Sequence, residues 1–127
     1  MLETCLYVND LKAAEAFYTN VLGLKRYAGV PGRHVFFRCG EGMFLLFDPE
    51  ATTEESAMGI PSHGAVGEGH VAFEMSEVEL ELWKKKLADH DVAIESDFTW
   101  PNGGRPLYFR DPANNSGELT TGKTWGL

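Results

Sequence analysis

The chain has little cysteine and no long apolar run. Cys5 and Cys39 are the only cysteines among the 127 residues, and they lie far apart in the sequence. We therefore interpret both as reduced thiols, which is typical of a cytoplasmic protein. No stretch approaches the roughly 20 apolar residues of a membrane span, and the first residues lack the basic region and apolar core of a signal peptide. The sequence predicts a cytoplasmic protein with no membrane partner.

Positive charge is also scarce. The chain has 11 Lys and Arg against 19 Asp and Glu, so its net charge is −8. Nucleic acids and anionic membranes bind proteins through clustered Lys and Arg. The one basic run, at 84–86, follows three glutamates and is typical of a solvated helix face. We expect no nucleic-acid partner.

What is present is an ordinary globular composition, with 43% hydrophobic and 12% aromatic residues. A chain of this length is typical of one domain. It can bury about two thirds of its unfolded surface, so its core needs no disulfide or metal.

The same pattern of elements occurs twice along the chain. In the first half, an alternating run precedes an Asn9-Asp10 helix cap, and Gly23 stands where a left-handed helix end is favoured. In the second half, Ser76 and Glu79 form a capping box. The predicted elements are strands at 2–8, 24–30, 34–39 and 43–47 with a helix at 11–22, then strands at 70–75, 92–100, 106–110 and 118–121 with a helix through Val78, Leu82, Trp83 and Leu87.

The pattern predicts an α+β fold of two βαβββ modules. We expect one domain with module one at 1–48, a linker loop at 49–69, module two at 70–121, and a C-terminal tail at 122–127 that has no further strand or helix to join. The linker is polar and rich in glycine, and we expect it to form a mobile edge over a cavity.

The two halves superpose at an offset of 67 residues. Glu3 lies seven residues before Asp10, and His70 lies seven residues before Glu77. Side chains alternate along a strand, so Glu3 and His70 should both lie on the face opposite the helices. The repeat therefore predicts two titratable groups at equivalent positions in one shared concavity.

Four runs stand out in this order along the chain: Leu2–Leu24, Gly69–Phe73 (GHVAF), Leu107–Asn115 (LYFRDPANN) and Gly117–Leu119. Together they resemble the vicinal oxygen chelate superfamily, which includes glyoxalase I, fosfomycin-resistance transferases, extradiol dioxygenases and bleomycin-binding proteins. The resemblance covers nearly the whole chain. It implies that the two modules form a half-open barrel around a metal site. In the turn at 111–115, Asn114 stands where the family usually has glycine.

The resemblance implies one divalent metal ion, with Glu3, His70 and Glu118 as its ligands. Two carboxylates and an imidazole suit Zn, Ni, Mn, Fe or Co, and three protein ligands leave open positions for substrate. The strand at 43–47 has no candidate for a fourth ligand. No organic cofactor is implied. Each ligand also has a structural interpretation: His70 as a hydrogen-bonded strand residue, Glu3 as a charge near a frayed terminus, and Glu118 as an edge-strand charge.

Further candidates surround this ligand set. Glu3, Glu118 and His63 are the candidate catalytic residues, because a displaced carboxylate or a loop histidine could transfer a proton; His63 could equally be a solvated loop residue. Cys5 is either a cavity thiol or a small buried hydrophobe. The side chains that could clamp an anionic substrate, or remain surface charges, are Arg33, His34 and Arg105.

The predicted function is a metal-dependent, glyoxalase-like enzyme that acts on a small oxygen-chelating substrate. Lyase, isomerase, transferase and dioxygenase types remain open. The alternative is a non-catalytic binding protein of the bleomycin-binding type. The expected partners are a small-molecule substrate and a second copy of the chain, since the aromatic end around Trp125 could dock on a partner subunit.

Overall fold

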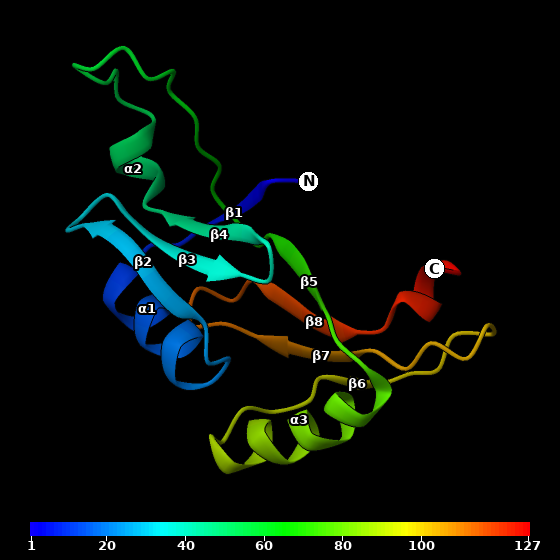
Figure 1. The fold of residues 1–127 in the computed structure, drawn as a ribbon. Helices are drawn as coiled ribbons and strands as arrows, with labels where there is room; N and C mark the ends of the chain where they lie inside the picture. Colours follow the sequence, from blue (N-terminus) through cyan, green and yellow to red (C-terminus); the bar gives the residue numbers. More distant parts are fainter. The chain divides into compact units, whose positions relative to one another are not determined.

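The computed structural model describes residues 1–127, except for the side chain of Asp97. The chain divides into two compact units, Met1–Gly69 and His70–Leu127 (Figure 1). The first contains β1 (Glu3–Tyr7), α1 (Leu11–Asn20), β2 (Lys25–Val30), β3 (His34–Cys39), β4 (Gly42–Phe47) and α2 (Pro49–Thr52). The second contains β5 (His70–Glu74), α3 (Glu77–Asp89), β6 (Ser96–Asp97), β7 (Leu107–Arg110), β8 (Ser116–Thr120) and the 3₁₀ helix η1 (Gly122–Trp125).

Each unit has one sheet, and the two sheets share a topology. The strand orders are β1-β4-β3-β2 and β5-β8-β7-β6. In each sheet the first strand pairs in parallel with the last, and the remaining pairs are antiparallel. These observations confirm the mixed α+β class and the two βαβββ modules.

The predicted repeat is accurate for the first strands. The bounds of β5 equal those of β1 plus 67, since 3 + 67 = 70 and 7 + 67 = 74. The helix caps differ by only 66, because Asp10 caps α1 and Ser76 caps α3. Both caps act as the sequence predicts: Asp10 accepts from the Ala13 amide, and Ser76 and Glu79 make both bonds of a capping box.

The inward face of α3 differs from the prediction. Leu80 and Leu87 are buried, whereas Val78 and Leu82 are 74% and 60% exposed. Leu80 and Leu87 lie about two helical turns apart, so they form one narrow buried stripe, and Val78 and Leu82 lie outside it. Apolar spacing alone does not choose between two such neighbouring stripes.

One strand prediction was wrong, and two further segments contain short helices that the sequence did not predict. Only Ser96–Asp97 of the expected strand 92–100 pairs with β7, because Ile94, Phe98 and Trp100 are exposed and the segment has no buried face. The linker begins with α2, whose N-cap Asp48 accepts from the Glu50 amide, with Pro49 in the first turn. The tail contains η1, which ends at Gly126 with φ of 71°.

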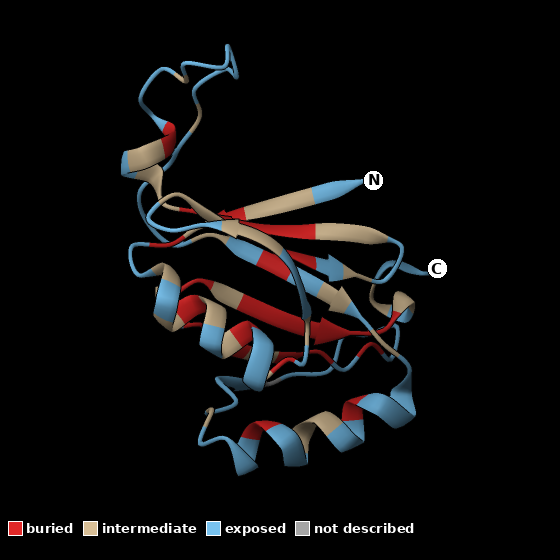
Figure 2. Cartoon of the chain, turned by 60° about the vertical axis from the view of Figure 1, so that its left-hand side comes forward, coloured by how far each residue is buried: buried red, intermediate tan, exposed pale blue. Residues whose placement is uncertain are grey.

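The core of each unit lies between its sheet and its long helix. Figure 2 shows buried residues along the strands and on one stripe of each helix, while most of the segment after α2 is exposed. Tyr18 of α1 packs on Phe37 and Phe44 in the first unit, and Leu87, Phe109 and Leu119 are fully buried in the second. None of the helices in the described part of the chain has the length and apolar character to cross a bilayer.

Candidate functional site

The parallel ladder between β5 and β8 brings His70 and Glu118 together. His70 is the register partner of Ser116, and Ala72 is the register partner of Glu118. The imidazole Nε2 lies 3.2 Å from Glu118 Oε2, and Nδ1 lies 3.2 Å from Ser116 Oγ. The His70 side chain is 51% exposed and that of Glu118 only 9%. A buried carboxylate thus faces an accessible imidazole whose far nitrogen is held by a hydroxyl.

Side-chain hydrogen bonds of Asp111 hold the turn between β7 and β8. Asp111 Oδ1 accepts hydrogen bonds from the amides of Ala113 and Asn115, and Oδ2 accepts one from the Asn115 side chain. Asn114 has φ of 67°, in the left-handed region of the backbone map. Asn tolerates this region better than most other non-glycine residues. The turn therefore determines where β8 begins and which residues of β7 and β8 pair.

Tyr108 of β7 shapes the other side of the carboxylate. It is the antiparallel register partner of Glu118, so the two side chains share a face. Burial raises the pKa of the Tyr108 phenol above its ordinary value, and the negative charge of Glu118 raises it further. The phenol consequently stays protonated at neutral pH beside Glu118.

His70 and Glu118 have the chemistry that a divalent ion requires. An imidazole nitrogen and a carboxylate oxygen are both common ligands of Zn²⁺ and its neighbours. The Ser116 hydroxyl can donate or accept, so it can hold the ring in either tautomer, as the outer partners of ligating histidines do. Within the described residues, no group of three or more His, Cys, Asp and Glu side chains is close enough to hold an ion. The geometry shows two of the three expected ligands together.

The third expected ligand, Glu3, belongs to the first unit. It lies at the start of β1, is exposed, and pairs with Met43 of β4. Leu45 of β4 pairs with Cys5, as Glu118 of β8 pairs with Ala72. Because Cys5 and Ala72 are equivalent in the repeat, Leu45 stands where the second module has its carboxylate. The first module thus lacks a counterpart of Glu118.

The first unit contains its own cavity, with a volume of about 540 Å³ on the face that carries Glu3. That size is within the ordinary range for small-molecule sites. Aromatic rings form much of its wall. The lining residues are Glu3, Tyr27, Arg33, Phe36, Arg38, Met43, Leu45, Phe47, Ile60 and His63. A neighbouring hollow is lined by Glu3, Thr4, Cys5, Tyr7, Leu45, Phe47 and His63, so Cys5 does lie beside Glu3.

Tyr7 anchors His63 over this cavity. The phenol Oη lies 2.7 Å from His63 Nδ1, and the imidazole packs edge-on against Phe47 with centroids 4.7 Å apart. The His63 backbone amide donates to the Thr52 carbonyl at 3.0 Å. Burial raises the pKa of the Tyr7 phenol, and neighbouring Cys5 raises it further. A protonated phenol can therefore donate to His63 Nδ1.

Arg33 and His34 lie beside the same aromatic wall. Arg33 Nη1 is 2.7 Å from His34 Nδ1, and because guanidinium can only donate, Nδ1 must accept. The ring of His34 stacks on Phe36 with centroids 4.1 Å apart. Burial lowers the pKa of His34, and the charge of Arg33 lowers it further. His34 is thus a neutral, oriented ring that leaves the positive charge with Arg33.

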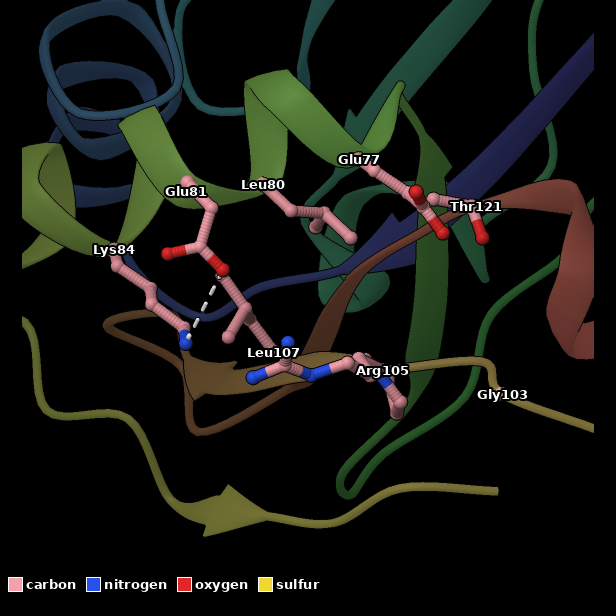
Figure 3. A pocket seen from close by; sticks show the side chains of 9 residues that line it. Glu77, Leu80, Glu81, Lys84, Gly103, Arg105, Leu107 and Thr121 are labelled. Carbon is pink, nitrogen blue, oxygen red and sulfur yellow. Dashed lines mark ion pairs between the residues drawn. The ribbon is translucent and has the colours of Figure 1, made fainter. Parts of the chain in front are cut away.

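Arg105 lies elsewhere. It lines a separate hollow of the second unit, between α3 and the segment before β7 (Figure 3). Leu107 lines the same hollow, while Tyr108 pairs with Glu118. Since side chains alternate along a strand, Leu107 lies on the helix side of the sheet, and Arg105, just before the strand, lines the same hollow beside α3. Arg105 is therefore not brought to His70 and Glu118.

Sequence reasoning missed three residues around these groups: Tyr7, Tyr108 and Ser116. Alternation placed Tyr7 with Glu3, but its hydrogen bond to His63 depends on the path of a long loop. The register of β5 with β8 identifies Ser116, and that of β7 with β8 identifies Tyr108. The Asp111 turn, which the sequence displays, connects β7 directly to β8 and so sets their register, whereas the register of β5 with β8 is a pairing between distant segments.

The sequence and structure of the chain are similar to those of several known proteins. The chain is 46% identical to lactoylglutathione lyase from Agrobacterium tumefaciens, whose crystal structure superposes with a TM-score of 0.96, covering 100% of this chain and 96% of that one. A glyoxalase/bleomycin resistance protein/dioxygenase from Nocardioides is 26% identical, with a TM-score of 0.74 over 94% of this chain and 81% of that one. Metallothiol transferase FosB of Bacillus licheniformis is 28% identical over 93% of this chain and 72% of its own length.

The family's own sequence pattern matches residues 1–119. That match includes both βαβββ modules up to Leu119 of β8, and therefore His70 and Glu118. The chain belongs to the Glyoxalase/Bleomycin resistance protein/Dioxygenase superfamily.

Proposed function

We propose that this chain is a divalent-metal-dependent enzyme of the glyoxalase type, acting on a small substrate with adjacent oxygen atoms. The observation that carries the proposal is the 3.2 Å separation of His70 Nε2 and Glu118 Oε2, because an imidazole and a carboxylate so placed can ligate one ion. Membership of the superfamily supports it. Glu3 is the proposed third ligand, and the ion is Zn, Ni, Mn, Fe or Co. When bound, such an ion polarises substrate oxygen atoms and stabilises negative charge on them.

The first unit supplies the groups that bind substrate and move its proton. Arg33 offers a positive charge beside the aromatic wall, which suits an anionic substrate with an apolar part. The phenol of Tyr7 can donate to His63 Nδ1, and in that arrangement Nε2 is the ring atom of His63 that exchanges a proton with substrate. A displaced Glu3 or Glu118 carboxylate is the alternative proton acceptor.

A thiol conjugate is the proposed substrate class. The 46% identical protein is named lactoylglutathione lyase, and the 28% identical one is named metallothiol transferase FosB. Lactoylglutathione lyase activity is the first reaction to test because that relative matches over the whole chain. Thiol transfer is the second, because the 28% identical relative is named a metallothiol transferase.

The test begins with protein stripped by a chelator and reloaded separately with Zn, Ni, Mn, Fe or Co. We expect about one ion per chain and turnover in a lactoylglutathione assay or a thiol-transfer assay with at least one metal. Metal binding without turnover in either assay would favour the non-catalytic alternative, in which the chain only binds a small molecule. Failure to bind any of the five ions would contradict the proposal.

We further propose a homodimer with the C-terminal segment at the interface. Trp125 is 77% exposed at the end of η1, and Leu127 is also exposed, so both offer apolar surface to a partner. Sedimentation should give about twice the chain mass of 14.1 kDa, and Trp125→Ser should shift the protein toward monomer. A monomeric parent protein with metal bound would contradict this proposal.

A further inference from the structure

The hollow beside α3 has the features of a second ligand site. Its volume is about 270 Å³, just under the roughly 300 Å³ at which ordinary small-molecule sites begin, so its ligand has to be small. Leu80, Pro106 and Leu107 are buried and form an apolar floor. Charged side chains form the rim, and Figure 3 shows α3 on one side and the segment from Gly103 to Leu107 on the other.

Of the cations on the rim, Arg105 is the one without a hydrogen bond or ion pair in the described part of the chain, although its charge helps to lower the pKa of Glu77. Glu77 Oε1 is bound by Lys123 Nζ at 2.6 Å, and Glu81 Oε1 is paired with Lys84 Nζ at 3.6 Å. Arg105 is exposed, and within the described residues no hydrogen bond or ion pair engages its guanidinium. Both carboxylates are therefore partly neutralised by their own lysines, whereas Arg105 remains available for an anion.

Thr121 provides a second, independent indication that the hollow beside α3 binds a ligand. It also lines the hollow, is 8% exposed, and follows directly after β8. Its Oγ1 is the single buried side-chain nitrogen or oxygen without a hydrogen-bond partner in the part of the chain that the structure describes. A buried hydroxyl without a partner costs free energy, which a ligand that accepts its proton would recover.

We propose that this hollow binds a small organic monocarboxylate with an apolar body. The carboxylate lies against the Arg105 guanidinium and accepts a hydrogen bond from Thr121 Oγ1, after a rotation of that side chain. The apolar body lies on Leu80, Pro106 and Leu107. The site is separate from His70 and Glu118, because Leu107 lies on the opposite side of the sheet from Tyr108 and Glu118, and Arg105 lines the same hollow as Leu107.

Benzoate is a suitable probe, with benzyl alcohol as its uncharged analogue. The full-length protein, stripped of metal by a chelator, is titrated with each compound and followed by amide chemical shifts. We expect benzoate to shift the amides of Leu80, Gly104 and Thr121, and to bind at least tenfold more tightly than benzyl alcohol. The use of metal-free protein keeps this result independent of the proposed catalytic function.

Two variants and a matched control test the assignment. Arg105→Met keeps the apolar stem and should weaken benzoate binding at least tenfold, and Thr121→Val should weaken it severalfold. Lys85→Met removes one positive charge from the exposed side of α3 and should leave the affinity unchanged. Equal weakening by Arg105→Met and Lys85→Met would show a general charge effect and overturn the proposal. So would benzoate shifts confined to the cavity around His63.

Discussion

His70 of β5 and Glu118 of β8 lie 3.2 Å apart through Nε2 and Oε2, although 48 residues separate them in the sequence, since 118 − 70 = 48. If they ligate one ion, removing the imidazole should reduce the affinity for that ion at least tenfold, because the loss of even an outer-shell partner has an effect of this size. The folded core should survive His70→Ala because the side chain is half exposed. Metal content after dialysis, measured by elemental analysis, checks this expectation.

The matched control for that variant is His90→Ala. His90 is exposed at the C-terminal end of α3 and touches none of the proposed ligands. Full metal occupancy in both variants would contradict the role of His70, whereas loss in both would indicate a general effect on folding.

Tyr7→Phe tests the anchoring of His63. The variant removes the 2.7 Å contact between the phenol and Nδ1 but retains the aromatic ring. We expect turnover to fall by roughly tenfold or more if His63 transfers a proton, and stability to fall by about 1 kcal/mol, as for one net hydrogen bond. Tyr27→Phe is the control, because Tyr27 lines the same cavity but is exposed. Equal activity in the two variants would argue against a role for the Tyr7–His63 pair.

Gly117→Ala tests the packing behind Glu118. A Cβ at Gly117 would collide with the ring of Phe109, which is fully buried. We expect this overpacking to lower the free energy of unfolding by about 1–3 kcal/mol. Combining the change with Phe109→Leu should cost less than the sum of the two single variants, which a double-mutant cycle in urea would measure. Additive losses would show that the collision is relieved in another way.

The lowered pKa of His34 predicts that the free energy of unfolding depends on pH. Burial and the charge of Arg33 lower the pKa of His34 in the folded protein, so the unfolded chain binds more protons once the pH falls below the ordinary histidine value of about 6.5. The stabilising effect of the neutral ring is therefore complete above that value and is lost as the pH falls toward the lower folded pKa. Urea unfolding at pH 7.5 and 5 should show a smaller acid-induced loss for His34→Gln than for the parent chain. Equal losses would contradict the expectation.

The parts of the fold that the sequence predicts accurately depend on local patterns. The alternation in 2–8 and 70–75, the caps at Asp10 and Ser76, and the Asn114 turn each involve a few neighbouring residues, and all are present in the structure. The predicted strand at 92–100 was wrong because a strand requires a partner, and β7 pairs with only two of those residues. Non-local pairing is not contained in a short run of residues.

In the candidate site, too, contacts between regular strands were predictable and contacts that depend on a loop were not. The register of β5 with β8 follows from two well-defined strands, and it brings His70 to Glu118. The contact between Tyr7 and His63 depends on the course of the loop after α2, which residue types do not specify. Arg105 was expected, with Arg33 and His34, to be able to clamp an anionic substrate, but it precedes β7 and lines the hollow beside α3.

Each sheet is built from the strands of one unit alone, and this has a genetic consequence. Among the described strands, every ladder joins two strands of the same unit, and β1 and β5 are edge strands with β4 and β8 as their respective neighbours. A recombination event between codons 69 and 70 would separate the two halves without interrupting a hydrogen-bonded ladder. Duplication or fusion of one such gene segment likewise leaves each inherited strand order intact, so this architecture can be rearranged in a genome one whole sheet at a time.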